Sequence, residues 1–351
     1  MPKYYTRVCN FYFGKSSLNK IKEKKSLPLN GNPLISFDSF ELITKTKKKI
    51  VQLDQINRLR HDIKKKVKKD LELVTKKKKF KKLNLNNQPI IMGVLNLTPD
   101  SFSDGGQYNN KSSGYARAIY LFNKGCDILD IGGESTRPGS KEVKIDIEWK
   151  RIKAILKKLS KLNKFISIDT RKSKIMSKSL NYKISLINDV SGLSHDPDTI
   201  DLLRRSNSPF VIHHMKGVPE NMQKKPKYKN VVLEIYDFFD RKIKQLREIG
   251  IKHNNIILDP GIGFGKNLKH NITILKNISL FHSLGYPLLL GTSRKRFIKD
   301  ISGLNDSKYR LGGTLASCIF LKMQGVQILR VHDINEIKQG IKIFRTLKFN
   351  D

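Results

Sequence analysis

Short apolar runs and longer amphipathic stretches alternate along the chain from residue 90 onward. The runs are Ile90–Leu95, Ile128–Ile131, Phe165–Ile168, Ser185–Ile187, Phe210–Ile212, Ile256–Leu258, Pro287–Leu290 and Gln327–Val331. Short apolar runs of this kind predict buried strands, and the patterns between them, such as 231–249 and 309–324, predict helices. Eight strands in strict alternation with helices predict an α/β fold, a (β/α)8 TIM barrel. An open doubly wound sheet is the alternative.

The first 88 residues lack this alternation. Residues 35–43 alternate apolar and polar positions, which predicts a strand, and apolar residues at steps of three and four over 56–74 predict an amphipathic helix. We therefore expect an N-terminal α+β extension over residues 1–88 and a barrel over 89–351. The extension could be a cap on the barrel, a basic appendage or a targeting region. Targeting is disfavoured, because transit peptides are rich in arginine and need no buried strand.

The chain carries a formal net charge of +38, which raises the question of nucleic-acid binding. Most of the excess is lysine, and the lysine runs lack the interleaved aromatic residues of nucleic-acid sites. We favour a solvated basic surface that would steer an anionic substrate, and RNA binding by residues 1–80 is the alternative. No apolar run approaches the roughly 20 residues of a membrane span. Three widely spaced cysteines fit a reducing, cytoplasmic setting.

Polar residues gather at the carboxyl ends of the predicted strands. The carboxyl ends of parallel barrel strands meet at one face, so these side chains should surround one site. In chain order they are Asn96, Asp130, Asp169, Asn188, Asp189, His213, His214, Met215, Asp259, Ser293, Arg294, Lys295, Arg330 and His332. One aspartate at a strand end is often a helix N-cap. Polar residues at every strand end of one face indicate a functional site instead.

Two chemically different sets stand out among these residues. Asp169, Asn188, Asp259 and Lys295 suit a heterocycle with a guanidine-like edge, because carboxylates accept from ring N–H and amino groups. Asn96, Arg330 and His332 come from the first and last strands, which are neighbours in a closed barrel, and they suit a phosphate or pyrophosphate. The amide oxygen of Asn96, together with substrate phosphates, is a typical environment for Mg²⁺.

Two further motifs have simpler interpretations. His213 and His214 have no carboxylate at ligand spacing, so we take neither as a metal ligand, and we expect one to point inward and the other away. The string Gly261-Ile-Gly-Phe-Gly265 lacks the full spacing of a dinucleotide-binding loop and follows the sixth strand. It predicts a mobile glycine-rich loop that presents Phe264.

Seven strings in order resemble those of the dihydropteroate synthases. Met92-Gly-Val-Leu-Asn-Leu-Thr-Pro-Asp-Ser-Phe-Ser-Asp-Gly-Gly106 and Gly132-Gly-Glu-Ser-Thr-Arg-Pro-Gly139 resemble the two signatures of the family. Asn188-Asp-Val-Ser-Gly192, His214-Met-Lys-Gly217, the loop 259–266, Ser293-Arg-Lys295 and Arg330-Val-His332 follow in the family's order. The resemblance covers about residues 80–348.

The resemblance implies a transferase of folate biosynthesis that is inhibited by sulfonamides. It would join 6-hydroxymethyl-7,8-dihydropterin pyrophosphate to para-aminobenzoate, giving 7,8-dihydropteroate and pyrophosphate, with Mg²⁺ as cofactor and a homodimer as the assembly. A good leaving group beside an electron-rich ring favours a cation-like path, in which C–O cleavage runs ahead of attack. No membrane or nucleic-acid partner is expected.

The family pattern also assigns roles to residues of this chain. Asp169, Asn188, Met215, Asp259 and Lys295 would bind the pterin; Asn96, Arg137, Arg330 and His332 the pyrophosphate, with Asn96 also on the metal; and Phe102, Ser103, Thr136, Arg137, Pro138, Phe264 and Ser293 the arylamine or its closing loops. The residues expected to act in catalysis are Asp169, Lys295, Arg330 and His332.

Three departures from the family pattern are visible. Arg296 stands where many members have a small residue, and it would face the phosphates, pair outward or narrow the mouth of the site. His213 replaces a commoner apolar residue, and the first 88 residues exceed the usual lead-in. The rival interpretation is a pterin-binding barrel of the methyltetrahydrofolate–corrinoid type. Such a protein needs no pyrophosphate site, so Ser293-Arg-Lys295 and Arg330-Val-His332 argue against it.

Overall fold

Eight parallel strands form a closed barrel in the computed structural model, which describes residues 3–81, 83–85, 89–98, 111–136 and 139–349. The strands are β5 (Ile90–Asn96), β6 (Ile128–Gly132), β7 (Phe165–Asp169), β8 (Leu186–Asp189), β9 (Phe210–His213), β10 (Ile256–Asp259), β11 (Leu289–Leu290) and β12 (Ile328–Val331). They pair in the order β10-β9-β8-β7-β6-β5-β12-β11, and a bridge between Leu258 and Leu288 closes the ring. The predicted TIM barrel is confirmed.

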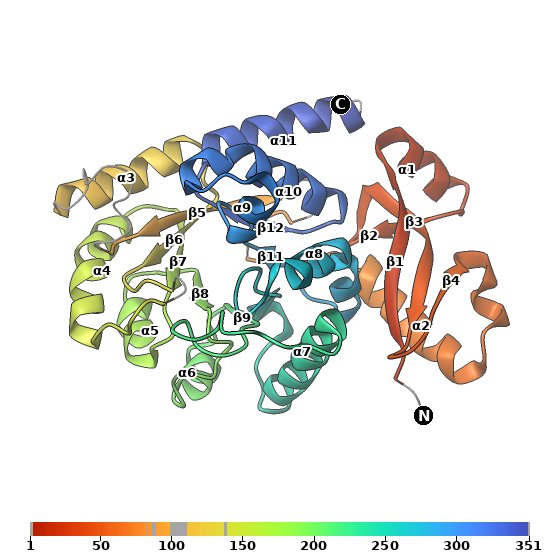
Figure 1. Ribbon diagram of the computed structural model, residues 1–351, viewed down its shortest axis with the longest axis horizontal. Coiled ribbons are helices and arrows are strands. Elements are labelled where there is room, and N and C mark those ends of the chain that lie inside the picture. Colours follow the sequence, from red (N-terminus) through yellow and green to blue (C-terminus); the bar gives the residue numbers. More distant parts are fainter. Residues whose placement is uncertain (1–2, 82, 86–88, 99–110, 137–138, 350–351) are drawn as a thin grey trace.

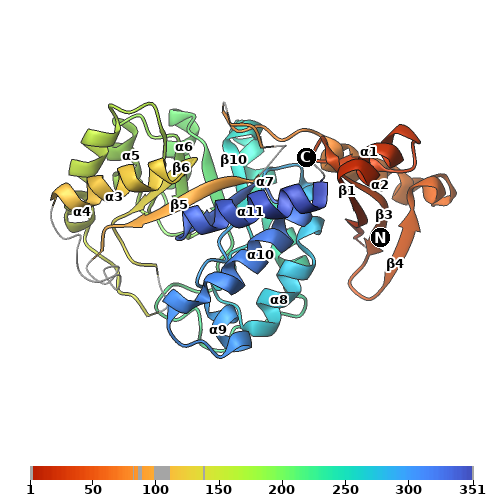
Figure 2. The same cartoon turned by 90° about the horizontal axis from the view of Figure 1, so that it is seen from above.

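Helices surround this barrel (Figures 1 and 2). They are α3 (Lys111–Asn123), α4 (Ile145–Leu159), α5 (Ser173–Leu180), α6 (Thr199–Ser206), α7 (Val231–Glu248), α8 (Leu268–Lys276), α9 (Arg296–Ser302), α10 (Leu311–Met323) and α11 (Ile334–Phe349), with the 3-10 turns η3 (His253–Asn255), η4 (Ile278–Leu284) and η5 (Ser307–Arg310). None of the helices in the described part of the chain combines the length and apolarity needed to cross a bilayer.

Side chains alternate between the barrel interior and its outer wall. Ile90, Ile128, Leu186, Val211, Ile257, Leu289 and Ile328 form one buried cluster inside the barrel, near the amino ends of the strands. Their chain neighbours Ile91, Leu129, Ile187, Ile212, Leu258, Leu290 and Leu329 belong to the cluster beneath the helices. Because successive strand residues face opposite sides, the inward positions nearer the carboxyl ends of the strands are the polar ones. The barrel therefore has an apolar floor and a polar mouth.

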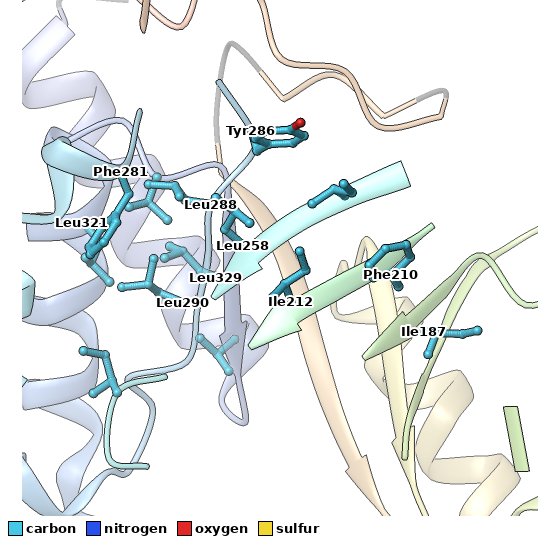
Figure 3. Close-up of a cluster of buried hydrophobic side chains, with 14 of the residues drawn as sticks. Ile187, Phe210, Ile212, Leu258, Phe281, Tyr286, Leu288, Leu290, Leu321 and Leu329 are labelled. Carbon is cyan, nitrogen blue, oxygen red and sulfur yellow. The ribbon is translucent and has the colours of Figure 1, made fainter. Parts of the chain in front are cut away.

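The outer cluster binds the helices to the wall of the barrel. In Figure 3, Leu258, Leu290 and Leu329 of the strands lie beside Phe281 of η4 and Leu321 of α10. All five side chains are fully buried. Burial of a large apolar side chain stabilises the fold by about 1.5–3 kcal/mol, so this layer holds the polar mouth in position.

The N-terminal extension is a four-stranded antiparallel sheet with two helices. Its elements are β1 (Tyr5–Phe13), α1 (Gly14–Lys22), β2 (Leu27–Leu29), β3 (Asn32–Ile43), β4 (Lys48–Gln52), the 3-10 turn η1 (Leu53–Arg58) and α2 (His61–Thr75). The strand predicted at 35–43 is confirmed as the central strand β3. The helix predicted from residue 56 begins only at His61, because Leu59 is extended (φ −73°, ψ 150°). The other three strands and α1 were not predicted.

The extension packs against the barrel through β1 and α2, which contact η4 (Figure 1). Every residue of η4 is buried. Ser279 of this turn donates to the carbonyl of Val8 at 2.8 Å, and His282 bonds the carbonyl of Gln324 at 2.8 Å and lies 3.4 Å from the amide nitrogen of Asn30. Of the roles left open above, the contacts support a cap on the barrel.

The link between the extension and the barrel contributes to the barrel floor. Phe80 and Leu85 are 1% and 4% exposed and pack in the interior cluster with Ile90 and Met92. Phe80 and Leu85 precede residue 88 but already belong to the core of the barrel. The boundary between residues 88 and 89 therefore stays a prediction.

We expect His282→Gln to weaken the acid sensitivity of the fold. Burial lowers the pKa of His282 to about 4 from 6.5, so between those values the unfolded chain takes up a proton that the folded chain refuses. Stability is therefore lost as pH falls from 6.5 to 4, by up to about 3 kcal/mol. Glutamine preserves a donor and an acceptor without titrating.

Urea unfolding at pH 7 and pH 5 measures this effect, and His61→Gln, at an exposed position on α2, is the matched control. A fall in unfolding free energy that is as steep in His282→Gln as in the wild type would contradict the prediction.

Candidate active site

A cavity of about 710 Å³ opens at the carboxyl ends of the barrel strands. Eight of the predicted site residues line it: Asn96, Thr136, Asp169, Phe264, Ser293, Lys295, Arg330 and His332. Asn188 and Asp259 are 2% and 5% exposed, and Met215 is half-buried; none of these three is a lining residue. Phe102, Ser103, Arg137 and Pro138 lie outside the described residues.

The guanidinium of Arg330 lies at the centre of the site. Its Nε donates to Asp130 at 2.7 Å and its Nη2 donates to Asp169 at 2.8 Å. Asp130 also accepts from the amide of Asn188 at 3.0 Å. Three strands, β6, β7 and β12, are thus joined through one cation. Asp130 was seen at a strand end but was not assigned to the site, and the inward alternation of β6 was the signal that could have found it.

Several buried oxygens at the mouth have no hydrogen-bond partner among the described residues. They include Oδ1 of Asp130, Oδ1 of Asp169 and Oδ1 of Asn188. A buried polar atom without a partner is costly, so the free oxygen of Asp169, which lines the cavity, indicates a ligand that donates to it, whereas Asp130 and Asn188 do not line the cavity. Acceptors gathered in this way suit a ligand edge that is rich in N–H groups.

The electrostatics of the mouth reflect deep burial. Burial raises the pKa of Asp169 to about 7, against the opposing effect of Arg330 and with a further increase from Asp130. Burial raises the pKa of Asp259 to about 6 and lowers that of Lys295 to about 8, where Arg330 adds to the lowering. Groups whose pKa values are shifted toward neutrality in a cleft are typical of functional sites.

The glycine-rich loop after β10 presents Phe264 to the cavity, as predicted. The Nζ of Lys295 lies 4.2 Å from the centroid of the Phe264 ring, and the ring of His213 meets it edge-on at 4.5 Å. The mobility expected of this loop stays a prediction. Side chains of the surrounding structure bind the loop, among them Gln223 to the carbonyl of Gly263 and Tyr228 to the carbonyl of Gly265.

His213, the last residue of β9, and His214, which follows it, are both buried, in different surroundings. His213 faces the barrel interior, with its Nε2 3.9 Å from a carboxylate oxygen of Asp259. His214 packs edge-on against Phe238 of α7 at 5.1 Å and approaches Lys266. Burial keeps the pKa of each imidazole well below its usual value. The expected opposite orientation is borne out by these contacts.

Arg296 stands at the rim of the cavity. Its side chain is 77% exposed, and its Nε lies 3.5 Å from Asp300 one helical turn later. Of the three orientations considered above, this ion pair supports the outward one. The neighbouring Arg294 pairs with Asp333 through two nitrogens, which joins the segments after β11 and β12.

A buried ionic network fixes the base of the loop that carries Thr136. Glu134 accepts from Arg171 at 2.9 Å and from Lys172 at 2.7 Å, and the same carboxylate accepts from the backbone N–H of Val143 at 2.8 Å. Lys172 also donates to Glu148 at 2.7 Å. Sequence reasoning did not find this network, because its charged residues resemble those of a solvated surface.

The described residues hold no group of three histidine, cysteine or acidic side chains that could enclose a metal ion. Asn96 lines the cavity, and its Oδ1 lies 3.4 Å from where a Cβ on Gly132 would stand. The bare glycine therefore leaves space between Asn96 and Asp169. One amide oxygen facing such a space suits a cation that takes its other ligands from water and substrate phosphates.

Comparisons with known proteins agree on one family. Residues 92–332 match the sequence profile of the family described as pterin binding enzyme. The chain is 38% identical over 258 residues to a dihydropteroate synthase of Escherichia coli, covering 73% of this chain and 91% of the relative. It is 41% identical over 268 residues to that of Neisseria meningitidis serogroup C, covering 75% and 94%.

Solved structures give the same result. The Yersinia pestis dihydropteroate synthase with a sulfonamide drug complex superposes with a TM-score of 0.72 at 36% identity, covering 77% of this chain and 98% of that one. The Xanthomonas albilineans dihydropteroate synthase with 4-aminobenzoic acid superposes at 0.70 and 33%, covering 76% and 94%. The family profile begins at residue 92, so it does not include the extension.

We expect Asp259→Asn to stabilise the fold at alkaline pH. The folded carboxyl has a pKa of about 6 against an ordinary 3.8, so stability is lost as pH rises through that window. Asparagine does not ionise, and its oxygen can still accept from the N–H of Gly261, as Asp259 does at 2.7 Å. The gain should be about 1–3 kcal/mol at pH 8 and smaller at pH 5. Urea titrations at the two pH values check it, and a loss of stability at pH 8 would show the opposite.

Proposed function

Because the chain belongs to the pterin-binding enzymes and, among them, to the dihydropteroate synthases, we propose how its barrel joins dihydropterin pyrophosphate to para-aminobenzoate. The observation that carries the proposal is the meeting of two residue sets in one cavity. Asp169 of the first set and Asn96 and His332 of the second all line it, and Arg330 contacts Asp169 directly.

The pterin ring occupies the deep end of the cavity in this proposal. Its guanidine-like edge donates to the unpartnered oxygens of Asp169 and Asn188 and to Asp259. Lys295, beside the Phe264 ring, donates to a ring acceptor. Met215 supplies apolar contact near the end of β9. Binding the ring would replace the missing partners of buried oxygens, which makes recognition of the N–H pattern strict.

The pyrophosphate lies toward β5 and β12. Arg330 lies on β12, His332 follows that strand directly, and Asn96 ends the neighbouring β5. Arg137, outside the described residues, is assigned there by the family pattern alone. When bound, Mg²⁺ would take the Asn96 oxygen and substrate phosphate oxygens as ligands and neutralise part of their charge.

The arylamine approaches from the open side of the cavity. Phe264, Ser293 and Thr136 line that part, and Phe102, Ser103 and Pro138 are assigned to it from the family pattern. His332 holds Ser293 through a contact of 3.0 Å between Nδ1 and Oγ. This contact links the pyrophosphate residues to the arylamine residues.

The reaction needs little proton chemistry from the protein. The bond between the pterin C6 methylene and oxygen breaks, and pyrophosphate leaves with the electron pair. The arylamine nitrogen then forms the C–N bond and loses its proton to solvent. A cation-like carbon is favoured by carboxylates near the ring and by cationic donors on the leaving group. Arg330 contributes to both effects in this proposal: it orients the carboxylate of Asp169 near the ring, and its own positive charge lies beside the pyrophosphate. We assign no general base.

The corrinoid-type alternative is not favoured, since the relatives are named dihydropteroate synthases. Binding of the pterin and arylamine also gains support from Xanthomonas albilineans structures that hold 7,8-dihydropteroate and 4-aminobenzoic acid. A cytoplasmic location stays a proposal, and the three cysteines Cys9, Cys126 and Cys318, none in a disulfide, support it.

We propose a homodimer that forms through the outer faces of α10 and α11. These two helices pack side by side, and they expose Phe320, Ile343 and Leu347 by 42%, 57% and 77%. Exposed apolar side chains gathered on neighbouring helices are typical of an interface.

We expect Lys295→Ala and Asp169→Ala to lower kcat/KM at least 100-fold while the protein stays folded, because each removes a group from the proposed pterin site. The assay is pyrophosphate release with dihydropterin pyrophosphate and magnesium, with and without para-aminobenzoate. The wild type should release pyrophosphate only with the arylamine, and a sulfonamide should inhibit it. Lys269→Ala, at an exposed position on α8, is the control. Turnover retained by either variant would remove that residue from the proposed pterin site.

We expect Ile343→Glu to convert a dimer into a monomer in light scattering, because a charge at the centre of an apolar contact must be desolvated. Ile147→Glu, at a position 47% exposed on α4, should leave the dimer intact. A wild type that is already monomeric at micromolar concentration would end the dimer proposal.

A further inference from the structure

The glycine-rich loop after β10 lies directly on the chain that follows β9. Gly261 and Gly265 have φ values of 71° and 62°, in the region that favours glycine. A Cβ on Gly261 would overlap the carbonyl of His214, and one on Gly265 would overlap the carbonyl of Lys216. The loop and the segment 214–216 therefore touch through their backbones, with no room for intervening side chains.

Lys266 ends this loop and turns back beneath it. The residue is 2% exposed, and its Nζ lies 2.9 Å from the carbonyl oxygen of Phe264, 3.2 Å from that of His214 and 3.1 Å from Nδ1 of the His214 ring. Three partners match the three hydrogens of an ammonium group. Within the described chain, no carboxylate lies within ion-pair distance of Lys266.

A buried lysine without an ion pair is an expensive feature. Removing an ammonium group from water costs several kcal/mol unless its surroundings offset the loss. Consistent with this cost, burial lowers the pKa of Lys266 to about 7. A methionine or leucine would fill the same space without the cost, so the hydrogen bonds of Lys266 call for an explanation beyond packing.

Other side chains hold the glycines of the loop but not Phe264. Gln223 donates to the carbonyl of Gly263 at 2.5 Å, and Tyr228 donates to that of Gly265 at 3.0 Å. The N–H of Gly263 donates to Asn271 at 2.8 Å. The carbonyl of Phe264 is left to Lys266. The N–H of Phe264 donates to the carbonyl of Gly261 at 3.1 Å, and among the side chains of the described chain Lys266 is the one that fixes the carbonyl of Phe264.

The ring of Phe264 transmits this orientation to the cavity. It lies between His213 and Lys295, and it lines the part of the cavity assigned to the arylamine. We propose that Lys266 is a positioning residue that orients Phe264 through its carbonyl and thereby sets the affinity for para-aminobenzoate. This inference rests on the proposed function.

The proposal predicts an effect confined to one substrate. In Lys266→Met the side chain keeps its apolar length but donates nothing, so Phe264 loses its orientation. We expect KM for para-aminobenzoate to rise at least tenfold, with KM for dihydropterin pyrophosphate within about twofold of the wild type. Lys266→Gln can still donate to carbonyls, so its KM for para-aminobenzoate should lie between those of the wild type and Lys266→Met. Lys269→Met on the exposed side of α8 should match the wild type.

A double-mutant cycle separates positioning from a general structural role. If Lys266 acts through Phe264, Lys266→Met should raise this KM no further once Phe264→Ala is present. If the two effects multiply instead, the proposal is overturned, and so it is if both substrates weaken equally or if only thermal stability falls. Should Lys266→Met fail to fold, Lys266→Gln takes its place in the cycle.

The same variants are also compared by the calorimetric affinity of para-aminobenzoate in the presence of pyrophosphate and magnesium. This measurement needs no turnover. A wild type that binds the arylamine but releases no pyrophosphate would count against the proposed function. The double-mutant cycle would then be run on the calorimetric affinities instead of KM, and it would still test the role of Lys266.

Discussion

A single guanidinium, that of Arg330, bridges two buried carboxylates and so holds the mouth of the barrel together. Asp130 is fully buried and Asp169 nearly so, and two ionised carboxylates this close would repel each other in a dry environment. Loss of one member of a buried ionic group costs about 3–5 kcal/mol because the remaining charge is left without compensation. The arginine is therefore a structural requirement of the mouth as well as part of the proposed chemistry.

This arrangement leaves one oxygen of each carboxylate without a partner among the described residues, and of the two residues Asp169 lines the cavity. Arg330 takes Oδ2 of Asp130 and Oδ2 of Asp169, while the two Oδ1 atoms have no partner among the described residues. Buried oxygens without a partner cost stability, and the apolar layers around the mouth offset that cost. The interior floor and the wall beneath the helices supply this stability, as Figure 3 shows for the wall. The apolar residues that stabilise the barrel interior thus lie near the amino ends of the strands, and the polar residues that would recognise a ligand lie near the carboxyl ends.

The N-terminal extension contributes to the apolar packing that stabilises the barrel. It covers η4, and with Phe80 and Leu85 its link to the barrel completes the floor. It contacts η4, which precedes β11, whereas the cavity opens at the carboxyl ends of the strands. Figures 1 and 2 show the extension on one side of the barrel. Its basic charge therefore lies far from the reacting groups. Contacts with the barrel account for its buried face without any nucleic acid.

The amino-acid sequence by itself determined the barrel and most of the residues at its mouth. The alternation of apolar runs with helical patterns is a local property, and the polar residue at each strand end is read directly from it, as at Asp169 and Asp259. Only the tertiary structure decided which of these residues bond to one another. The contact of Arg330 with Asp130 joins positions 200 residues apart, and the burial of Lys266 depends on a backbone 52 residues away. Periodicity reports which face a side chain occupies, whereas hydrogen bonding and burial depend on segments that only folding brings together.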